Sequence, residues 1–430
     1  MLTIPSHAAS ALLCLDGEWR VLEPDFEKDP STGVLALAAE VDEARLGAFD
    51  LAGHGFRQPF GAVGDPATLE TYVHPFYALE PRRTGAEAIF AILRDGDLHN
   101  RAAAAWRALE WRLWSGQPHA PEVLARGEGY LFFETDDGVG LGRARYPLRQ
   151  DGAPILFLRP RPGAAWRMLT PGDAVEDLIN EGRGVRALAA RAQLDGGAIC
   201  LHAAAIAVAG RAYVICGDKG LGKTSNLVWA LENLPGADFI SNDKVFISRG
   251  PSGPFVSGSP QSAPVRIGAL ARSPRLSRLL REGGQPGAAR GYRVTLDPDR
   301  RPSGGHGRYD PQEVYFAPSE LASVFGKHVL PGASLGAVVL LAPKSDRSPT
   351  PWSKIPAAEG LDELALHLRT RLDDAAPYWD VLLPSQTGPG SLEIVLAGTQ
   401  FLRLSAAERL GEAWGRFADD GGLAAESEKV

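Results

Sequence analysis

One eight-residue stretch of the sequence combines glycines with a lysine and a hydroxyl residue. Residues 217–224 read GDKGLGKT and fit the pattern G-x-x-x-x-G-K-[ST] at every fixed position. Glycines let backbone N–H groups turn inward around phosphate oxygens. In such a loop the lysine reaches the β- and γ-phosphates, and the hydroxyl ligates Mg²⁺. This glycine-rich loop therefore predicts a nucleotide site in which Lys223 contacts phosphate and Thr224 contacts the metal.

The segments around the glycine-rich loop are those that a phosphate site requires. The apolar run 212–216 predicts a strand before the loop, and residues 223–233 predict an amphipathic helix after it. The positive end of that helix dipole would point at the same anion. A strand-to-helix turn that binds nothing is the weaker interpretation. The residues predicted to bind nucleotide are Gly217, Asp218, Lys219, Gly220, Leu221, Gly222, Lys223, Thr224 and Ser225.

A histidine and a carboxylate lie in the segments before and after the glycine-rich loop. His202 begins the apolar run 201–209, 21 residues before Lys223. Asp243 follows Asn242 between two further strand-like runs. Taken alone, His202 fits a hydrogen-bonded core histidine and Asp243 fits a carboxylate in a turn at a strand end. Both simple interpretations stay open on the residues themselves.

Residues 200–250 resemble the HPr kinase/phosphorylase family, whose catalytic domain belongs to the phosphoenolpyruvate-carboxykinase-like group of P-loop folds. His202 stands at the position of the family's histidine, 21 residues before the loop lysine. The loop resembles the family's GDSGxGKS, with Lys219 in place of the first serine. Residues 242–245 match the family's acidic pair before Arg-Val, with an amide in place of the first acid. Over residues 260–345 the resemblance is faint.

The resemblance implies a role for each matched residue. Asp243 would be the general base that takes the proton of an acceptor hydroxyl, and it would lie near Mg²⁺. His202 would lie beside the γ-phosphoryl group, polarising it or orienting Asp243. Such a site suits phosphoryl transfer, which needs mostly positioning and charge neutralisation. The implied catalytic residues are Asp243, His202 and Lys223, the metal ligands Thr224 and Asp243, and the further substrate or phosphate contacts Asn242, Lys244 and Arg266.

The chain departs from the family pattern at two places. The family's Glu-Val-Arg-Gly run aligns with PVRIG, where Pro264 replaces the glutamate and Arg266 is kept. The family's Pro-x-Arg-Pro-Gly-Arg segment, associated with phosphorylase activity, aligns with residues 330–341, which lack both arginines. We therefore expect a kinase whose acceptor differs from HPr and which lacks the reverse, phosphorolytic reaction.

A GTPase is the competing class of phosphate-binding protein. Residues 337–346, AVVLLAPKSD, imitate the N-K-x-D motif that reads guanine, but Pro343 stands where the asparagine should be. The D-x-x-G motif after the loop is Asp419 to Gly422, near the end of the chain and in the wrong order. Both observations disfavour the GTPase interpretation.

The pattern along the chain predicts an α/β fold with a mixed sheet, divided into two domains. Residues 1–195 predict a mixed α/β domain that helps bind the acceptor, with a helix pair over 172–193. Residues 196–420 predict the HPr-kinase-like nucleotide-binding domain, and 421–430 a frayed tail. Further elements expected are a hairpin from 130 onward, a strand at 336–342, and helices at 100–114, 318–326, 360–371 and 405–417.

One segment of the second domain is rich in glycine, proline and arginine. Residues 258–312 show little periodicity beyond a short helix near 274–282. Between 271 and 310, nine arginines face four acidic residues, a local excess of five positive charges (9 − 4). This composition predicts a lid or an acceptor-recognition loop.

Composition and charge exclude several classes of protein. The net charge of −7 argues against a nucleic-acid partner, which selects for a basic surface. Three cysteines in 430 residues rule out a disulfide framework, and no Cys/His spacing suggests zinc. The first residues lack the features of a signal peptide, and the apolar run near 332–343 is too short to span a bilayer. We expect a cytoplasmic protein with no membrane partner.

These observations favour an ATP- and Mg²⁺-dependent kinase that transfers the γ-phosphoryl group to a hydroxyl. The acceptor would be a serine or threonine of a peptide or small protein, or a small-molecule alcohol. The alternative is a nucleotide-binding regulatory protein that hydrolyses slowly or not at all. Asn242 supports this alternative, because one carboxylate of the acidic pair is missing. The resembling family forms oligomers, which allows a homo-oligomer here.

Overall fold

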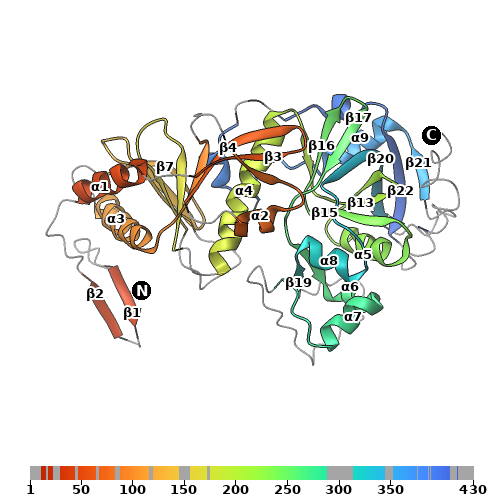
Figure 1. Ribbon diagram of the computed structural model, residues 1–430, viewed down its shortest axis with the longest axis horizontal. Coiled ribbons are helices and arrows are strands. Elements are labelled where there is room, and N and C mark those ends of the chain that lie inside the picture. Colours follow the sequence, from red (N-terminus) through yellow and green to blue (C-terminus); the bar gives the residue numbers. More distant parts are fainter. Residues whose placement is uncertain are drawn as a thin grey trace, which may run out of the picture.

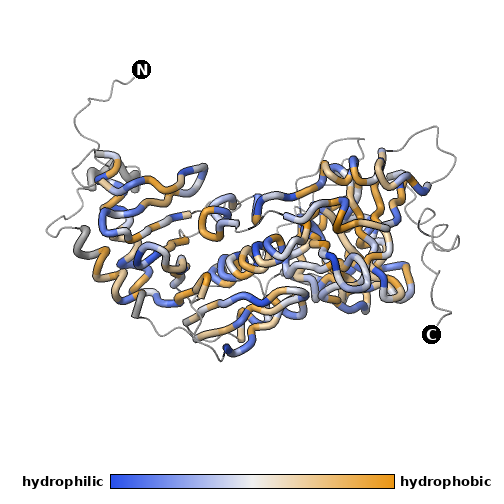
Figure 2. The backbone as a smooth tube through the Cα atoms, turned by 90° about the horizontal axis from the view of Figure 1, so that it is seen from above, coloured by the Kyte–Doolittle hydropathy of each residue, from blue (hydrophilic) through white to orange (hydrophobic). Residues whose placement is uncertain are grey.

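The computed structural model is an elongated α/β molecule with two large sheets (Figure 1 and Figure 2). Parallel and antiparallel strand pairs occur in both sheets, so the predicted mixed α/β fold class is confirmed. The structure describes residues 11–15, 18–22, 30–43, 47–63, 67–82, 88–115, 120–144, 155–171, 175–287, 313–343, 352–374, 376–385, 387, 389–406 and 414.

The first large sheet draws its nine strands from residues 47–170. They are β3 (Gly47–Gly53), β4 (Phe56–Val63), β5 (Ala78–Pro81), β6 (Phe90–Arg94), β7 (Glu122–Gly127), β8 (Tyr130–Glu134), β9 (Gly140–Ala144), β10 (Ile155–Arg159) and β11 (Trp166–Thr170). Their order is β5-β3-β4-β6-β11-β10-β9-β8-β7. The predicted hairpin from residue 130 onward is the antiparallel pair β8–β9.

Both faces of the first sheet are covered, because successive side chains of a strand point to opposite faces. On β8, Leu131 and Phe133 pack in the cluster that includes helices α1 (Pro30–Glu43) and α3 (Gly96–Ser115). Phe132, between them, packs in the cluster on the other face. Helix α3 matches the helix predicted over 100–114.

The other face of the first sheet is covered by helices α2 (Ala67–Val73) and α4 (Val175–Asp195). Helix α4 is continuous, so the predicted helix pair over 172–193 is wrong. Gly182 and Gly184 lie inside the helix and do not interrupt it. A Cβ atom on Gly182 would lie 2.3 Å from the Tyr72 ring, so this glycine serves close packing rather than a turn.

A segment from the far end of the chain packs against the first sheet. The ring of Trp379, at the start of the short helix α10 (Trp379–Leu382), meets Phe90 and Phe157 edge-on at centroid distances of 5.6 and 5.7 Å. Helix α4 also contacts the first strand of the second sheet. Contacts therefore run from the late segment to the first sheet and from helix α4 to the second sheet. The domain boundary at 195/196 stays a prediction.

The second large sheet draws its nine strands from residues 199–406. They are β12 (Ile199–Leu201), β13 (Ala203–Val208), β14 (Arg211–Cys216), β15 (Ala237–Asn242), β16 (Val245–Gly250), β17 (Gly253–Ser257), β20 (Gly332–Pro343), β21 (Trp352–Ile355) and β22 (Gln400–Ala406). The order is β12-β16-β17-β20-β14-β13-β15, and β22 joins β20 to β21. Helix α5 (Lys223–Asn233) packs on β13, β14 and β15, and helices α9 (Ala357–Ala365) and α11 (Leu392–Val395) lie on the other side.

The segment predicted as a lid is more ordered than its composition suggested. Residues 258–287 contain strand β18 (Ala263–Arg266) and helices α6 (Ile267–Arg272) and α7 (Pro274–Arg281). They share a buried core with strand β19 (Glu313–Phe316) and helix α8 (Pro318–Val324). The helix predicted near 274–282 is therefore confirmed as α7, but the segment also contains β18 and α6, and residues 288–312 lie outside the described part.

Two other predictions concern the end of the chain. The helix predicted over 405–417 begins too early, because Ser405 and Ala406 belong to β22. Trp414 is helical and buried, and the rest of that range lies outside the described part. Strands β1 (Ala11–Leu15) and β2 (Glu18–Leu22) form a separate hairpin. Among the helices that the structure describes, none combines the length and apolar character needed to cross a bilayer.

Replacing Trp379 with alanine tests the packing of the late segment on the first sheet. Trp379 is fully buried, and loss of a large buried aromatic ring costs about 3–5 kcal/mol of unfolding free energy. Urea unfolding followed by circular dichroism measures the change. The matched control is Trp114→Ala, whose side chain is 56% exposed on α3, with an expected change within about 0.5 kcal/mol. Equal stability of the two variants would contradict this packing.

Candidate functional site

Three strand ends meet at one edge of the second sheet. Strand β13 lies between β14 and β15 and is antiparallel to both, so β14 and β15 end where β13 begins. The register pairs Ala203, the first residue of β13, with Cys216, the last residue of β14. His202, the glycine-rich loop and residues 242–243 therefore leave the sheet side by side, although up to 41 residues separate them in sequence.

The glycine-rich loop needs glycine at both of its ends. A Cβ atom on Gly217 would lie 2.9 Å from the Cβ atom of Leu341 on β20, closer than side-chain atoms approach. Gly222 is the N-cap of α5 and has φ 97°, a left-handed conformation that glycine adopts without steric cost. These two positions let the chain turn from the buried end of β14 directly into the first turn of α5.

The rest of the loop is open to solvent. Asp218, Lys219 and Gly220 are exposed, and the backbone of Leu221 donates to the Asp218 carbonyl over 3.2 Å. Ser225 is half-buried in the first turn of α5. An exposed tip between two glycines is suited to approach by a ligand.

The buried side chain of Asn226 hydrogen-bonds to the glycine-rich loop. Asn226 Nδ2 donates to the Gly222 carbonyl over 3.0 Å, and Asn226 Oδ1 accepts from Trp414 Nε1 over 2.8 Å. Asn226 is fully buried, so both ends of its amide need such partners. Sequence reasoning missed this residue, although a polar side chain among apolar helix positions was a signal for it.

The Lys223 side chain folds back over the glycine-rich loop. Its Nζ donates to the Gly217 carbonyl over 2.7 Å and lies 3.4 Å from the Asp218 carbonyl. Burial lowers the pKa of the Lys223 ammonium; Asp243 raises that pKa in part, and Arg369 lowers it further. Asp243 and Arg369 therefore both act electrostatically on the Lys223 ammonium.

Thr224 contacts the end of β15. Its hydroxyl donates to Asn242 Oδ1 over 3.1 Å, which joins the first turn of α5 to the residue before Asp243. Asn242 is buried and Thr224 is half-buried. The amide thus occupies the position at which a carboxylate would face the hydroxyl of a nucleotide-binding loop.

Asp243 lies at the centre of a polar cluster. Its Oδ1 is 2.8 Å from His202 Nδ1, and its Oδ2 accepts from Gln261 Nε2 over 2.6 Å. Burial raises the pKa of the Asp243 carboxyl, but the bond from His202 and the charges of His202 and Lys244 outweigh burial and lower it below the usual value of 3.8. Asp243 is therefore a carboxylate at neutral pH, although its side chain is half-buried.

The backbone of Asp243 is unusual. Its φ is 84°, one of two positive values among the non-glycine residues that the structure describes. Asp tolerates this region better than most residues. Ser241 Oγ donates to the Lys244 carbonyl over 2.5 Å and closes the turn around it. The turn directs the Asp243 carboxylate back toward His202.

A segment after α9 completes the cluster. The His202 backbone N–H donates to the His367 carbonyl over 2.9 Å, and the Arg369 N–H donates to the Cys200 carbonyl over 2.8 Å. His367 is buried, and burial lowers the pKa of its imidazole. Sequence reasoning missed His367, Arg369 and Gln261, because no local pattern links them to the glycine-rich loop.

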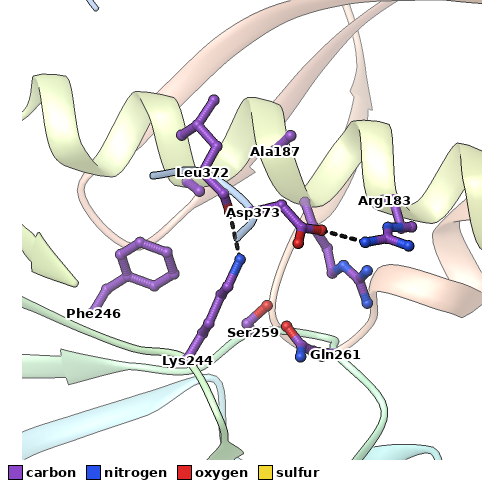
Figure 3. Close-up of a pocket in the computed structure, with 10 residues that line it drawn as sticks. Arg183, Ala187, Lys244, Phe246, Ser259, Gln261, Leu372 and Asp373 are labelled. Carbon is purple, nitrogen blue, oxygen red and sulfur yellow. Dashed lines mark hydrogen bonds and ion pairs between the residues drawn. The ribbon is translucent and has the colours of Figure 1, made fainter. Parts of the chain in front are cut away.

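Two residues predicted as phosphate contacts point elsewhere. The Lys244 Nζ donates to the Leu372 carbonyl, on the side of the turn that faces α4 (Figure 3). Arg266, at the end of β18, pairs with Glu313 of β19 over 3.0 Å.

The oxygen atoms around Thr224 suit a hard cation. The Thr224 hydroxyl, the Asn242 amide oxygen and the nearby Asp243 carboxylate are ligands of the kind that Mg²⁺ accepts. Over the described residues, no group of three or more His, Cys, Asp or Glu side chains could hold a metal by itself.

The fold and the site define a mixed α/β protein with a glycine-rich loop between a strand and a helix. No protein-family model matches the chain, and no curated protein matches it. Among solved structures, it resembles the HPr(Ser) kinase/phosphatase from Coxiella burnetii with 12% identity and a TM-score of 0.24, over 52% of this chain and 96% of that one. A likeness of this size carries no argument about activity.

Substituting Gly217 tests the close approach of the loop to β20. In Gly217→Ala the new Cβ atom meets backbone-anchored atoms of Leu341, so β20 or the loop must shift, at a cost of about 1–3 kcal/mol. Thermal unfolding measures the loss. Gly268→Ala is the matched control on α6, where a Cβ atom meets nothing within 4 Å and helix propensity improves. If Gly217→Ala is as stable as the control, the loop does not depend on this contact.

Proposed function

We propose that the protein is an ATP- and Mg²⁺-dependent kinase that transfers the γ-phosphoryl group to an alcohol hydroxyl. The observation that carries the proposal is the contact between Asp243 and His202, 2.8 Å long, beside the glycine-rich loop. A carboxylate kept ionised next to a lysine and a threonine of such a loop matches the needs of phosphoryl transfer. The cytoplasmic location and a homo-oligomeric state stay predictions.

In the proposed reaction, the acceptor oxygen attacks the γ-phosphorus atom of ATP. The bond from that phosphorus to the β–γ bridging oxygen breaks, ADP leaves, and the hydroxyl proton passes to the Asp243 carboxylate. Lys223 neutralises charge on the phosphates, and His202 keeps the Asp243 carboxylate oriented through the 2.8 Å contact. Mg²⁺, held by Thr224 and Asp243, would neutralise further phosphate charge.

The low pKa of Asp243 is compatible with this role. A carboxyl with a pKa below 3.8 is a weak base, but the transition state of phosphoryl transfer is loose and the proton leaves late. Orientation of the hydroxyl then matters more than base strength. Because the pKa is lowered, Asp243 stays ionised down to below pH 3.8, so it contributes no change of rate between pH 5 and 8.

Two substitutions separate binding from chemistry. Asp243→Asn keeps the shape of the side chain and is expected to retain ATP binding while lowering phosphoryl transfer about 10²- to 10⁴-fold. Lys223→Ala removes an ammonium from the loop and is expected to weaken ATP binding about tenfold to a hundredfold. Calorimetry with ATP and transfer of label from γ-labelled ATP to candidate acceptors measure the two effects. Unchanged transfer by Asp243→Asn would refute the mechanism.

A regulatory nucleotide-binding protein is the second candidate function. The contact of the Thr224 hydroxyl with an amide oxygen, 3.1 Å long, favours it, because Asn242 cannot supply the negative charge of a second carboxylate. Weaker metal binding would then give slow hydrolysis and a long-lived bound state. ATP would act as a ligand that changes partner binding rather than as a phosphoryl donor.

The substitution Asn242→Asp separates the two candidates. In a regulatory protein, the added carboxylate beside Thr224 is expected to strengthen Mg²⁺ binding and raise ATP hydrolysis at least tenfold. In a kinase that works with the amide, a second charge close to Asp243 is expected to raise the pKa of the pair and lower phosphoryl transfer. Steady-state hydrolysis and transfer assays, run with the wild type in parallel, distinguish a gain from a loss.

A further inference from the structure

A pocket lies between α4 and the turn that carries Asp243. Figure 3 shows side chains from α4, from the start of β16 and from two loops pointing into the same space. The pocket is lined by Arg183, Arg186, Ala187, Ala190, Lys244, Phe246, Ser259, Gln261, Leu372 and Asp373.

The pocket carries an excess of positive charge. Arg183 and Arg186 lie three residues apart on α4, a spacing that places them on one face of the helix. Lys244 enters from the opposite wall, and Asp373 is the one carboxylate of the lining. Three cationic side chains and one carboxylate leave two positive charges in excess (3 − 1).

The Asp373 carboxyl interacts electrostatically with all three cations. Its Oδ2 lies 2.6 Å from Arg183 Nη2. Burial raises the pKa of the Asp373 carboxyl, yet the charges of Arg183, Lys244 and Arg186 outweigh burial and lower it to about 2. The single carboxylate therefore pairs with Arg183, while the other two cations contribute from a distance.

In the described residues, the hydrogen bonds found for Lys244 and Arg186 go to neutral groups. Lys244 Nζ donates to the Leu372 carbonyl, and Arg186 Nη1 donates to the Tyr72 hydroxyl over 3.0 Å. Within the described part of the chain, neither side chain forms an ion pair with a carboxylate. Both side chains are half-buried, and Asp373 is the one carboxylate of the lining, so it only partly neutralises the three cations; a bound anion would reduce the repulsion that remains.

The pocket and the candidate site share a wall. Gln261 lines the pocket and also donates to Asp243 Oδ2 over 2.6 Å. Lys244 follows Asp243 in the chain, and its charge helps to lower the pKa of the Asp243 carboxyl. The pocket and the Asp243 carboxylate are therefore linked through a single side chain, Gln261.

We propose that this pocket binds the anionic group of the phosphoryl acceptor, so that the acceptor is a small alcohol bearing a carboxylate or a phosphate. The inference rests on the proposed kinase function and narrows its substrate class. The anion accepts charge-assisted hydrogen bonds from Lys244 and Arg186, which are stronger than bonds between neutral groups. Its hydroxyl then lies on the far side of Gln261, where Asp243 receives the proton.

The test measures binding without turnover. The full chain is loaded with Mg²⁺ and a non-hydrolysable ATP analogue, so that the glycine-rich loop is occupied. Glycerate, glycerol 3-phosphate and uncharged glycerol are then titrated by calorimetry. We expect at least one anionic probe to bind and glycerol not to bind. The comparison of glycerate with glycerol 3-phosphate distinguishes a carboxylate from a phosphate.

Two variants locate the bound anion. Lys244→Met keeps the length of the side chain without its charge and is expected to weaken binding of the anionic probe about tenfold to a hundredfold. Arg186→Met is expected to have an effect of similar size, and it serves if Lys244→Met fails to fold. Lys354→Met, an exposed lysine on β21, is the matched control and is expected to change nothing.

The outcomes separate this inference from the kinase proposal. Anion binding that is equal in the wild type and in both pocket variants overturns the pocket assignment, as does anion binding lost when the ATP analogue is present. Absence of binding by both anionic probes overturns it too. If ATP phosphorylates a neutral alcohol or a serine peptide, and Lys244→Met does not change that transfer, the anionic substrate class is wrong. The kinase function is then retained. If anion binding requires Lys244 but the protein transfers no phosphoryl group, the pocket assignment is supported and the kinase function is refuted.

Discussion

The hydrogen bond between His202 and Asp243 is the contact on which the candidate site depends. It joins the start of β13 to the turn after β15 across 2.8 Å. Asp243 has φ 84°, and a non-glycine residue in that region costs about 1–3 kcal/mol. Hydrogen bonds to a charged group contribute about 1.5–3 kcal/mol each, and the carboxylate receives one from His202 and one from Gln261. These two bonds outweigh the backbone cost, so the turn is held in a conformation that it would not adopt alone.

Much of this site could be predicted from sequence, because its parts are local patterns. The loop GDKGLGKT, the apolar run before it and the helix after it lie within a few residues of one another. Strand alternation placed β13, β14 and β15, and two antiparallel pairings bring their ends to one edge of the sheet. Once that topology holds, His202, Lys223 and Asp243 meet without any further requirement on the sequence.

The rest could not be predicted, because it depends on contacts between distant segments. His367 and Arg369 join the cluster through backbone hydrogen bonds to His202 and Cys200, which no local pattern predicts. The resemblance implied that Lys244 contacts substrate or phosphate, yet its Nζ donates to the Leu372 carbonyl on the side that faces α4. A helix pair was predicted over 172–193, whereas Gly182 and Gly184 allow the Tyr72, Phe90 and Trp379 rings to pack against one long helix. In each case the sequence showed the residue type but not the residue that it contacts in the fold.

Helix α4 contacts strands of both large sheets and carries Arg186 of the pocket. Lys223 lies over the glycine-rich loop, and Lys244 with Arg186 lines the pocket beside α4. Transfer between an anionic donor and an anionic acceptor requires two like charges to approach, and at 4 Å and an effective dielectric of 20 they repel by about 4 kcal/mol. Separate groups of cations on either side of one carboxylate counter that repulsion. Each anionic ligand is then neutralised by its own cations before the two ligands approach each other. A neutral acceptor would need only the loop-side group, so the second group of cations argues for the charged one.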